Sequence, residues 1–152
     1  NGPFGKGGNG LDMRLYIPVG EKWELSKSCI PTGDMLVQTN HDRQYLTGSQ
    51  VPVLHDIDND VFFAEEGSLD GKPFYGAVAT DAGTGKRICY EVCKDFKFWV
   101  IWNDHGDKGY FCPEPCTWII DAPNQPIPPE ESGYRELAPG ESHTVTEKIY
   151  TA

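Results

Sequence analysis

The stretch that decides the fold is FKFWVIW at residues 96–102, the most apolar run of this 152-residue chain. Lys97 is its only polar residue. A run of this length is short for a helix and typical of a strand, which spans about 4–8 residues. Because apolar side chains would fall on both faces of such a strand, the run predicts a central strand buried on both sides.

Further strand signals lie on both sides of this stretch. Residues 11–17 alternate apolar and polar side chains, which is typical of a half-buried strand. Residues 74–79 and 87–92 flank a glycine-containing turn at residues 81–85, which predicts a hairpin. Other strand-like runs lie at residues 35–37, 51–54, 61–64, 118–120 and 144–150. Short strands, frequent turns and no amphipathic helix of useful length predict an all-β sandwich or barrel.

The remaining segments are expected to connect these strands within one domain. Residues 1–10 hold no apolar periodicity and are interpreted as a flexible, glycine-rich leading segment before a domain at residues 11–152. Residues 30–34 carry a turn signal. The proline-rich residues 123–129 are interpreted as a surface crossing, because strand signals lie on both sides of them.

The charge of the chain excludes several classes of partner. A formal net charge of −10 argues against binding to nucleic acid, because neutralising phosphates requires clustered Lys and Arg. The same charge disfavours an anionic membrane surface, and no stretch approaches the roughly 20 apolar residues of a membrane-spanning helix. A neutral sugar is compatible with this charge.

Five cysteines lie at positions 29, 89, 93, 112 and 116, so at least one thiol has no disulfide partner within the chain. Two C-x3-C spacings invite a zinc interpretation. However, no C-x2-C pair is present and no histidine pair stands at zinc-finger spacing, so we expect no metal site. Whether any two cysteines form a disulfide stays open at this stage.

Glu114 is the strongest candidate for a chemical role. It stands between Pro113 and Pro115, which stiffen the backbone and cannot donate an amide to a sheet. Glu114 is therefore expected to be held in a fixed direction at a strand end or crossing. The aromatic neighbours Tyr110, Phe111 and Trp118 would raise the pKa of a carboxyl group toward the range useful for proton transfer. A random glutamate is more often a solvated loop residue. The flanking prolines and aromatic residues favour the functional interpretation.

An acidic run at residues 56–60 precedes the strand expected at 61–64. Its carboxylates could accept hydrogen bonds from sugar hydroxyls, and the alternative for each is a solvated turn. The run lacks the glycine and the later glutamate of an EF-hand, so calcium is not expected. The four histidines, at positions 41, 55, 105 and 143, show no spacing that suggests a metal site or a nucleophile's base.

Several motifs resemble those of the aldose 1-epimerase (galactose mutarotase-like) family. They are Cys112-Pro113-Glu114-Pro115, Thr117, Asp121-Ala122-Pro123-Asn124, Leu137-Ala138-Pro139-Gly140-Glu141, Ile30-Pro31-Thr32-Gly33 and Asp60-Val61-Phe62-Phe63. They occur in the family's order across nearly the whole chain. The resemblance favours a cytoplasmic protein, and a secreted one stays open.

The resemblance implies a β-sandwich of the supersandwich type that interconverts the α and β anomers of an aldose without a cofactor. It assigns the catalytic base to Glu114 and a sugar-binding carboxylate to Asp60, with Asp58 as an alternative registration. Trp102 would lie on a strand beside the sugar, where an aromatic face packs against C–H groups.

The chain also departs from the family pattern. The family's acid histidine and other sugar-binding residues belong to a preceding half that this chain does not contain, so we expect only part of the full fold, its C-terminal part. Such a half would leave edges and an apolar face to be covered, which predicts a complementary chain or self-association. Two other functions stay open: a carbohydrate-binding or assembly module without turnover, and a subunit of a carbohydrate lyase or hydrolase.

Overall fold

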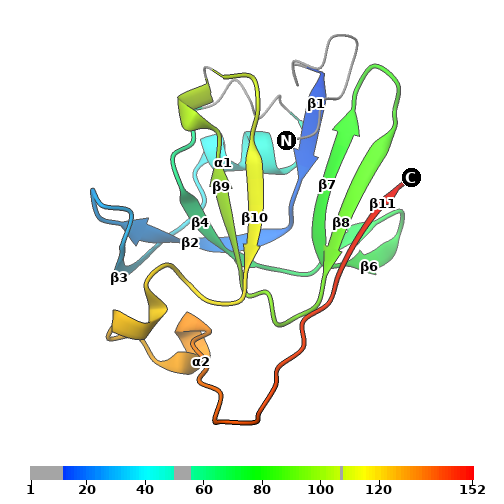
Figure 1. The fold of residues 1–152 in the computed structure, drawn as a ribbon. Helices are drawn as coiled ribbons and strands as arrows, with labels where there is room; N and C mark the ends of the chain where they lie inside the picture. Colours follow the sequence, from blue (N-terminus) through cyan, green and yellow to red (C-terminus); the bar gives the residue numbers. More distant parts are fainter. Residues whose placement is uncertain (1–11, 50–55, 107) are drawn as a thin grey trace.

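The computed structural model describes residues 12–49, 56–106 and 108–152, and Figure 1 shows how they are arranged. In these residues, eleven strands form two larger sheets and one two-stranded hairpin, all with antiparallel pairing. The strands are β1 (Met13–Tyr16), β2 (Val19–Leu25), β3 (Pro31–Leu36), β4 (Asp60–Ala64), β5 (Gly67–Leu69), β6 (Lys72–Phe74), β7 (Gly76–Asp81), β8 (Arg87–Val92), β9 (Phe98–Trp102), β10 (Cys112–Cys116) and β11 (Glu147–Thr151). The predicted all-β class is confirmed.

The strands are arranged in two layers. One sheet has the order β1-β7-β8-β11 and the other the order β10-β9-β4-β2-β3, while β5 and β6 pair with each other. The helical segments between them are short: α1 (Asn40–Leu46), η2 (Asp104–Gly106), η3 (Ala122–Asn124) and α2 (Pro129–Ser132). No helix among the described residues is long and apolar enough to cross a membrane.

The main core contains residues of both larger sheets, which is the defining feature of a sandwich. Met13 and Leu15 enter it from β1, and Phe62 and Trp99 enter it from β4 and β9. The alternation predicted for residues 11–17 is confirmed in the described part, because every second side chain from Met13 is buried. This periodicity directs one face of β1 into the core.

The apolar stretch at residues 96–102 forms β9, which lies between β10 and β4. Trp99 and Ile101 belong to the main core, whereas Phe98 and Val100 belong to a second core on the opposite face of the sheet. All four side chains are buried. The predicted central strand with two buried faces is therefore confirmed. Each fully buried side chain of this kind contributes about 1.5–3 kcal/mol.

The predicted hairpin is also confirmed, as the pair β7 and β8. At its turn the buried carboxylate of Asp81 accepts hydrogen bonds from the backbone N–H groups of Gly83 and Thr84, each at 2.9 Å. Gly85 has a φ of 73°, a conformation that glycine adopts without steric cost.

Two sequence predictions before residue 50 were wrong. Residues 30–34 do not form a turn, because Pro31 begins β3, and a proline is tolerated as the first residue of an edge strand. The helix α1 was not expected, because its seven residues are too short for a periodic pattern. Its signal is a capping box, in which Thr39 and Asp42 each accept a backbone hydrogen bond from the other.

A third prediction, a strand at residues 118–120, was also wrong. The chain turns after β10, and the N–H of Ile119 donates to the carbonyl of Ser132 at 2.9 Å, which joins this segment to α2. Ile119 is buried in the second core, so its apolar character reflects burial in a loop. The strand predicted at 51–54 and the leading segment at 1–10 lie outside the described residues.

Candidate functional site

Glu114 lies at the middle of β10, an edge strand of the five-stranded sheet. An edge strand tolerates Pro113 and Pro115 because only one of its sides must supply hydrogen bonds to a neighbour. The pairing with β9 places Glu114 opposite Val100. The side chain of Glu114 is exposed. Glu114 therefore lies within a strand instead of at a strand end or crossing, and its carboxylate is directed to the surface of the described structure.

Two thiols flank Glu114 on the same face of β10, because side chains at alternate positions point the same way. Burial, together with the nearby Glu114 carboxylate, raises the pKa of Cys116 to about 11. Burial and Glu114 likewise raise the pKa of Cys112. Both thiols are thus protonated at neutral pH. All five cysteines lie in the described residues, and none of them forms a disulfide.

The structure brings Trp102 onto the same face as Glu114. Trp102 lies opposite Cys112 in the register, two positions along β10 from Glu114. Side chains in this diagonal relation are about 7–8 Å apart, within reach of an aromatic ring. The ring of Trp102 is partly exposed and packs against Tyr110, with 5.7 Å between the ring centroids. A carboxylate and an aromatic surface therefore lie side by side at this end of the sheet.

The other aromatic residues expected around Glu114 lie elsewhere. Phe111 is buried in the main core, and Trp118 stacks on Tyr134 at 5.5 Å between centroids. Tyr110 packs against Trp102, and Glu114 is exposed, so the expected aromatic enclosure of Glu114 is not formed among the described residues.

Asp60 lies on the opposite face of the sheet from Glu114. Asp60 of β4 and Pro113 of β10 both pair with Ile101 of β9, so their side chains point to the same face of the sheet. Glu114 is the next residue after Pro113 and points to the other face, because side chains alternate along a strand. Its carboxylate accepts a hydrogen bond from the hydroxyl of Tyr45 at 3.0 Å and lies 3.5 Å from the ammonium of Lys22. The structure therefore does not bring Asp60 together with Glu114 and Trp102.

Asp60 belongs to a cluster with Lys22, Asp42 and Tyr45 that joins α1 to β2 and β4. Lys22 lies 3.1 Å from Asp42, whose side chain is 1% exposed. Burial raises the pKa of Asp42, but hydrogen bonds from Thr39 and the charge of Lys22 bring it below the usual range. Burial raises the pKa of Asp60, and burial with the nearby Asp60 charge also raises that of Tyr45. Tyr45 thus stays protonated and acts as a donor.

Asp58 lies two residues before the start of β4 and is exposed. It accepts a hydrogen bond from the side-chain amide of Asn59 at 3.1 Å. Asn59 has a φ of 58°, a left-handed conformation that interrupts the strand alternation before Asp60. The orientation of Asp58 is therefore independent of the alternation that turns Asp60 to the other face.

The described histidines have partners of their own. His105 lies 2.8 Å from the carboxylate of Asp56, and this hydrogen bond raises the pKa of His105. His41 packs edge-on against Tyr45, at 5.6 Å between ring centroids. His143 contacts Arg135. His55 lies outside the described residues.

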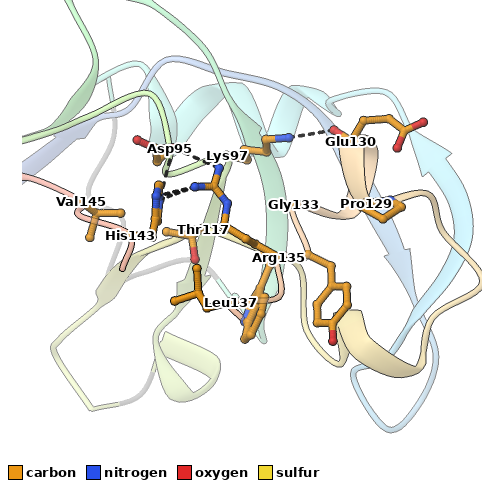
Figure 2. Close-up of a pocket in the computed structure, with 12 residues that line it drawn as sticks. Asp95, Lys97, Thr117, Pro129, Glu130, Gly133, Arg135, Leu137, His143 and Val145 are labelled. Atoms are coloured by element: carbon orange, nitrogen blue, oxygen red, sulfur yellow. Dashed lines mark hydrogen bonds and ion pairs between the residues drawn. The ribbon is translucent and has the colours of Figure 1, made fainter. Parts of the chain in front are cut away.

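A cavity of about 590 Å³ lies beyond the other end of β10. Its lining residues are Asp95, Lys97, Thr117, Trp118, Pro129, Glu130, Gly133, Tyr134, Arg135, Leu137, His143 and Val145. Glu114, Asp60 and Trp102 are not among these residues, which Figure 2 draws as sticks. Sequence reasoning missed this cavity, because three segments far apart in the chain build it. Among the described residues, no group of three or more His, Cys, Asp or Glu side chains could hold a metal ion.

Comparison with known proteins identifies the fold. The profile of the aldose 1-epimerase family matches residues 8–150. A crystal structure of a galactose mutarotase-like protein from Clostridium acetobutylicum matches with 34% sequence identity and a TM-score of 0.90. The match covers 100% of this chain and 45% of that one, so the chain spans less than half the length of this relative. The two-layer fold is thus a galactose mutarotase-like β-sandwich.

Proposed function

The chain belongs to the aldose 1-epimerase family, and we propose that it supplies one side of a site that interconverts the α and β anomers of a hexose. The observation that supports this most directly is the shared face of Glu114 and Trp102. A proline-held carboxylate and a partly exposed indole lie on neighbouring strands there. Sugars are bound by this combination, because aromatic faces pack against their C–H groups and carboxylates bind their hydroxyls.

In this proposal, Glu114 is the general base. Its carboxylate takes the proton of the C1 hydroxyl, while a general acid protonates the ring oxygen and the bond between C1 and that oxygen breaks. The aldehyde rotates, and the ring closes on its other face as both protons return. The acid comes from residues outside this chain. Acid and base each contribute about 10²–10⁴-fold to the rate, so this chain alone has little activity.

We assign the sugar-binding carboxylate to Asp58 rather than to Asp60. Asp60 is engaged by Tyr45 and Lys22 on the far face of the sheet, whereas Asp58 is exposed before β4. The chain then forms the C-terminal part of the full domain, and no cofactor takes part in the reaction.

The partner in this proposal is a complementary chain or a second copy that covers the exposed face. Glu114 is exposed, and a partner over it would exclude water from the site during proton transfer. At the opposite edge of the same sheet, β3 and the residue after it expose the consecutive apolar side chains Met35, Leu36 and Val37, which are 40%, 40% and 72% exposed. Light scattering tests this point, since a monodisperse monomer that resists proteolysis contradicts it.

Polarimetry on freshly dissolved α-D-glucose and α-D-galactose tests the activity, with the chain bound to its complementary half. We expect Glu114→Gln to lower the rate by at least about 100-fold, the share of one general base. Glu21→Gln, at an exposed position of β2, is the matched control and should keep the rate. Equal rates in the two variants would remove Glu114 from the mechanism.

A second function is favoured by one observation, the exposure of Glu114 in a chain that spans 45% of its relative. On this alternative the chain is a carbohydrate-binding or assembly module without turnover. Calorimetry separates the two, because a module binds the sugar and leaves the rate of anomer exchange at its spontaneous value.

A further inference from the structure

The cavity beyond β10 is built from three segments that are tied together by specific contacts. The ammonium of Lys97 donates to the carbonyl oxygen of Glu130 at 2.8 Å, which joins the start of β9 to α2. Gly133 follows α2 with a φ of 75°, and a Cβ atom there would lie 2.2 Å from the carbonyl oxygen of Thr117. Only glycine permits this close approach. The walls of the cavity are therefore held in place without a ligand.

One wall of the cavity is aromatic. Trp118 and Tyr134 are stacked, with 5.5 Å between ring centroids and an interplanar angle of 26°. Trp118 is 42% exposed, whereas Trp23 and Trp99 are 3% and 1% exposed in the cores. An exposed indole at the rim of a cavity presents a flat surface on which a sugar ring can pack. Leu137 extends this apolar surface.

A second part of the lining, called the cationic wall, contains Lys97 and Arg135. The guanidinium of Arg135 contacts the ring of His143, whose Nε2 lies 3.4 Å from the carboxylate of Asp95. Arg135 itself lies 3.8 Å from Asp95. The lining thus contains two permanent cations, Lys97 and Arg135, and two carboxylates, those of Asp95 and Glu130. Figure 2 shows the guanidinium of Arg135 beside His143 and Asp95, and the carboxylate of Glu130 directed away from Lys97.

We propose that this cavity binds a sugar that carries a phosphate or carboxylate group, at a site separate from Glu114. The sugar ring packs on Trp118, and the anionic group binds Lys97 and Arg135. A planar guanidinium with several N–H donors suits both anions, and Lys97 uses one of its three donors on Glu130. The cavity volume of about 590 Å³ falls within the roughly 300–1,000 Å³ of typical ligand sites.

Two cations in the lining of one cavity are significant in a chain whose net charge is −10. The surrounding field repels anions in general, so an anionic ligand needs a site that both attracts its charge and holds its ring. The aromatic wall and the cationic wall supply these two functions within one cavity. A neutral sugar would leave the cationic wall unused, and a bare anion would leave the indole unused.

Calorimetric titration of the full chain tests the proposal, with D-glucose 6-phosphate, D-glucuronate, D-glucose and inorganic phosphate as probes. We expect at least one of the two charged sugars to bind about tenfold or more tightly than D-glucose and than phosphate, because charge-assisted hydrogen bonds are strong. The two charged sugars distinguish a phosphate ligand from a carboxylate ligand. Quenching of Trp118 fluorescence reports binding independently.

Variants locate the site. Lys97→Met should weaken binding about tenfold or more, by the loss of a charge-assisted contact. Trp118→Ala should weaken it about two- to tenfold, by the loss of ring packing. Lys86→Met, at the exposed β7–β8 turn, is the matched control for charge and should change nothing. Glu114→Gln should also leave binding unchanged, so this result does not depend on the proposed epimerase site.

Several outcomes would overturn the proposal. They are no binding by either charged sugar, equal affinity for D-glucose, equal affinity for inorganic phosphate, and unchanged affinity in Lys97→Met. Thermal melting of each variant establishes that it is folded. If Lys97→Met unfolds through the loss of its contact to Glu130, Arg135→Gln provides the same test at an exposed side chain.

Discussion

The buried ion cluster under α1 gives the sharpest test of how this sandwich is held together. Lys22 lies 3.1 Å from Asp42 and 3.5 Å from Asp60, and the three side chains are 15%, 1% and 26% exposed. Substituting Lys22→Met removes the cation that both carboxylates share. It leaves two negative charges facing each other in a largely buried space, which is costly because neither can be solvated fully.

The expected loss follows from this geometry. Breaking a buried ion pair costs about 3–5 kcal/mol, and the partial exposure of Lys22 and Asp60 favours the lower end, about 3 kcal/mol. With a urea m-value of about 2 kcal/mol per molar, the midpoint of unfolding should fall by about 1.5 M. Urea titration followed by circular dichroism measures this shift. Lys27→Met, at an exposed loop lysine, is the matched control and should change the midpoint little.

The pH dependence sharpens the same test. The pKa of Asp60 is raised in the folded state, so its contribution favours folding at low pH and is lost as pH rises through that folded value. Without Lys22, ionisation of Asp60 in the folded state costs more. The loss in free energy of unfolding caused by Lys22→Met should therefore be larger at pH 7 than near pH 4. Asp60→Asn in the Lys22→Met background should recover part of the loss. A deficit below about 1 kcal/mol at pH 7, or no recovery, would refute the assigned role of Lys22.

Three further predictions follow from single features. Gly133→Ala should destabilise the chain by more than Gly71→Ala. Both glycines have a positive φ, but only a Cβ atom at position 133 would lie 2.2 Å from a backbone atom. Equal urea midpoints of the two variants would contradict this. Phe98→Ala should cost about 3–5 kcal/mol, since the ring is fully buried, and a loss below about 1 kcal/mol would contradict the second core. Asp56→Asn should lower the pKa of His105, measured by NMR titration, and an unchanged pKa would exclude their hydrogen bond.

The fold could be predicted from the sequence where the apolar pattern of a segment matches the faces that the structure buries. The apolar run at 96–102 and the alternation from residue 11 describe strands whose buried faces the sandwich then covers. The helix α1 escaped prediction because two reciprocal hydrogen bonds at Thr39 and Asp42 start it, and no periodic apolar face marks it. Residues 118–120 carried the apolar character of a strand, but they pack in a loop against the second core.

The candidate site was predicted in part. The prolines beside Glu114 indicated a stiff backbone, but they did not predict the strand β10 in which Glu114 lies. The face to which each carboxylate points depends on the register between β4, β9 and β10, which single residues do not encode. A shift of one position moves a side chain to the other face, and this decides between Asp58 and Asp60. The charged cavity depends on long-range contacts and left no local pattern.

The two prolines of β10 also make the five-stranded sheet directional. This five-residue strand has only three backbone N–H donors, because two of its residues are prolines. Its pairing with β9 also needs N–H donors from these three, so few are left to pair with an incoming strand. The β3 edge has no such barrier after its first residue. Growth of the sheet by strand addition is therefore favoured at one end only, which protects the surface around Glu114 from misassembly.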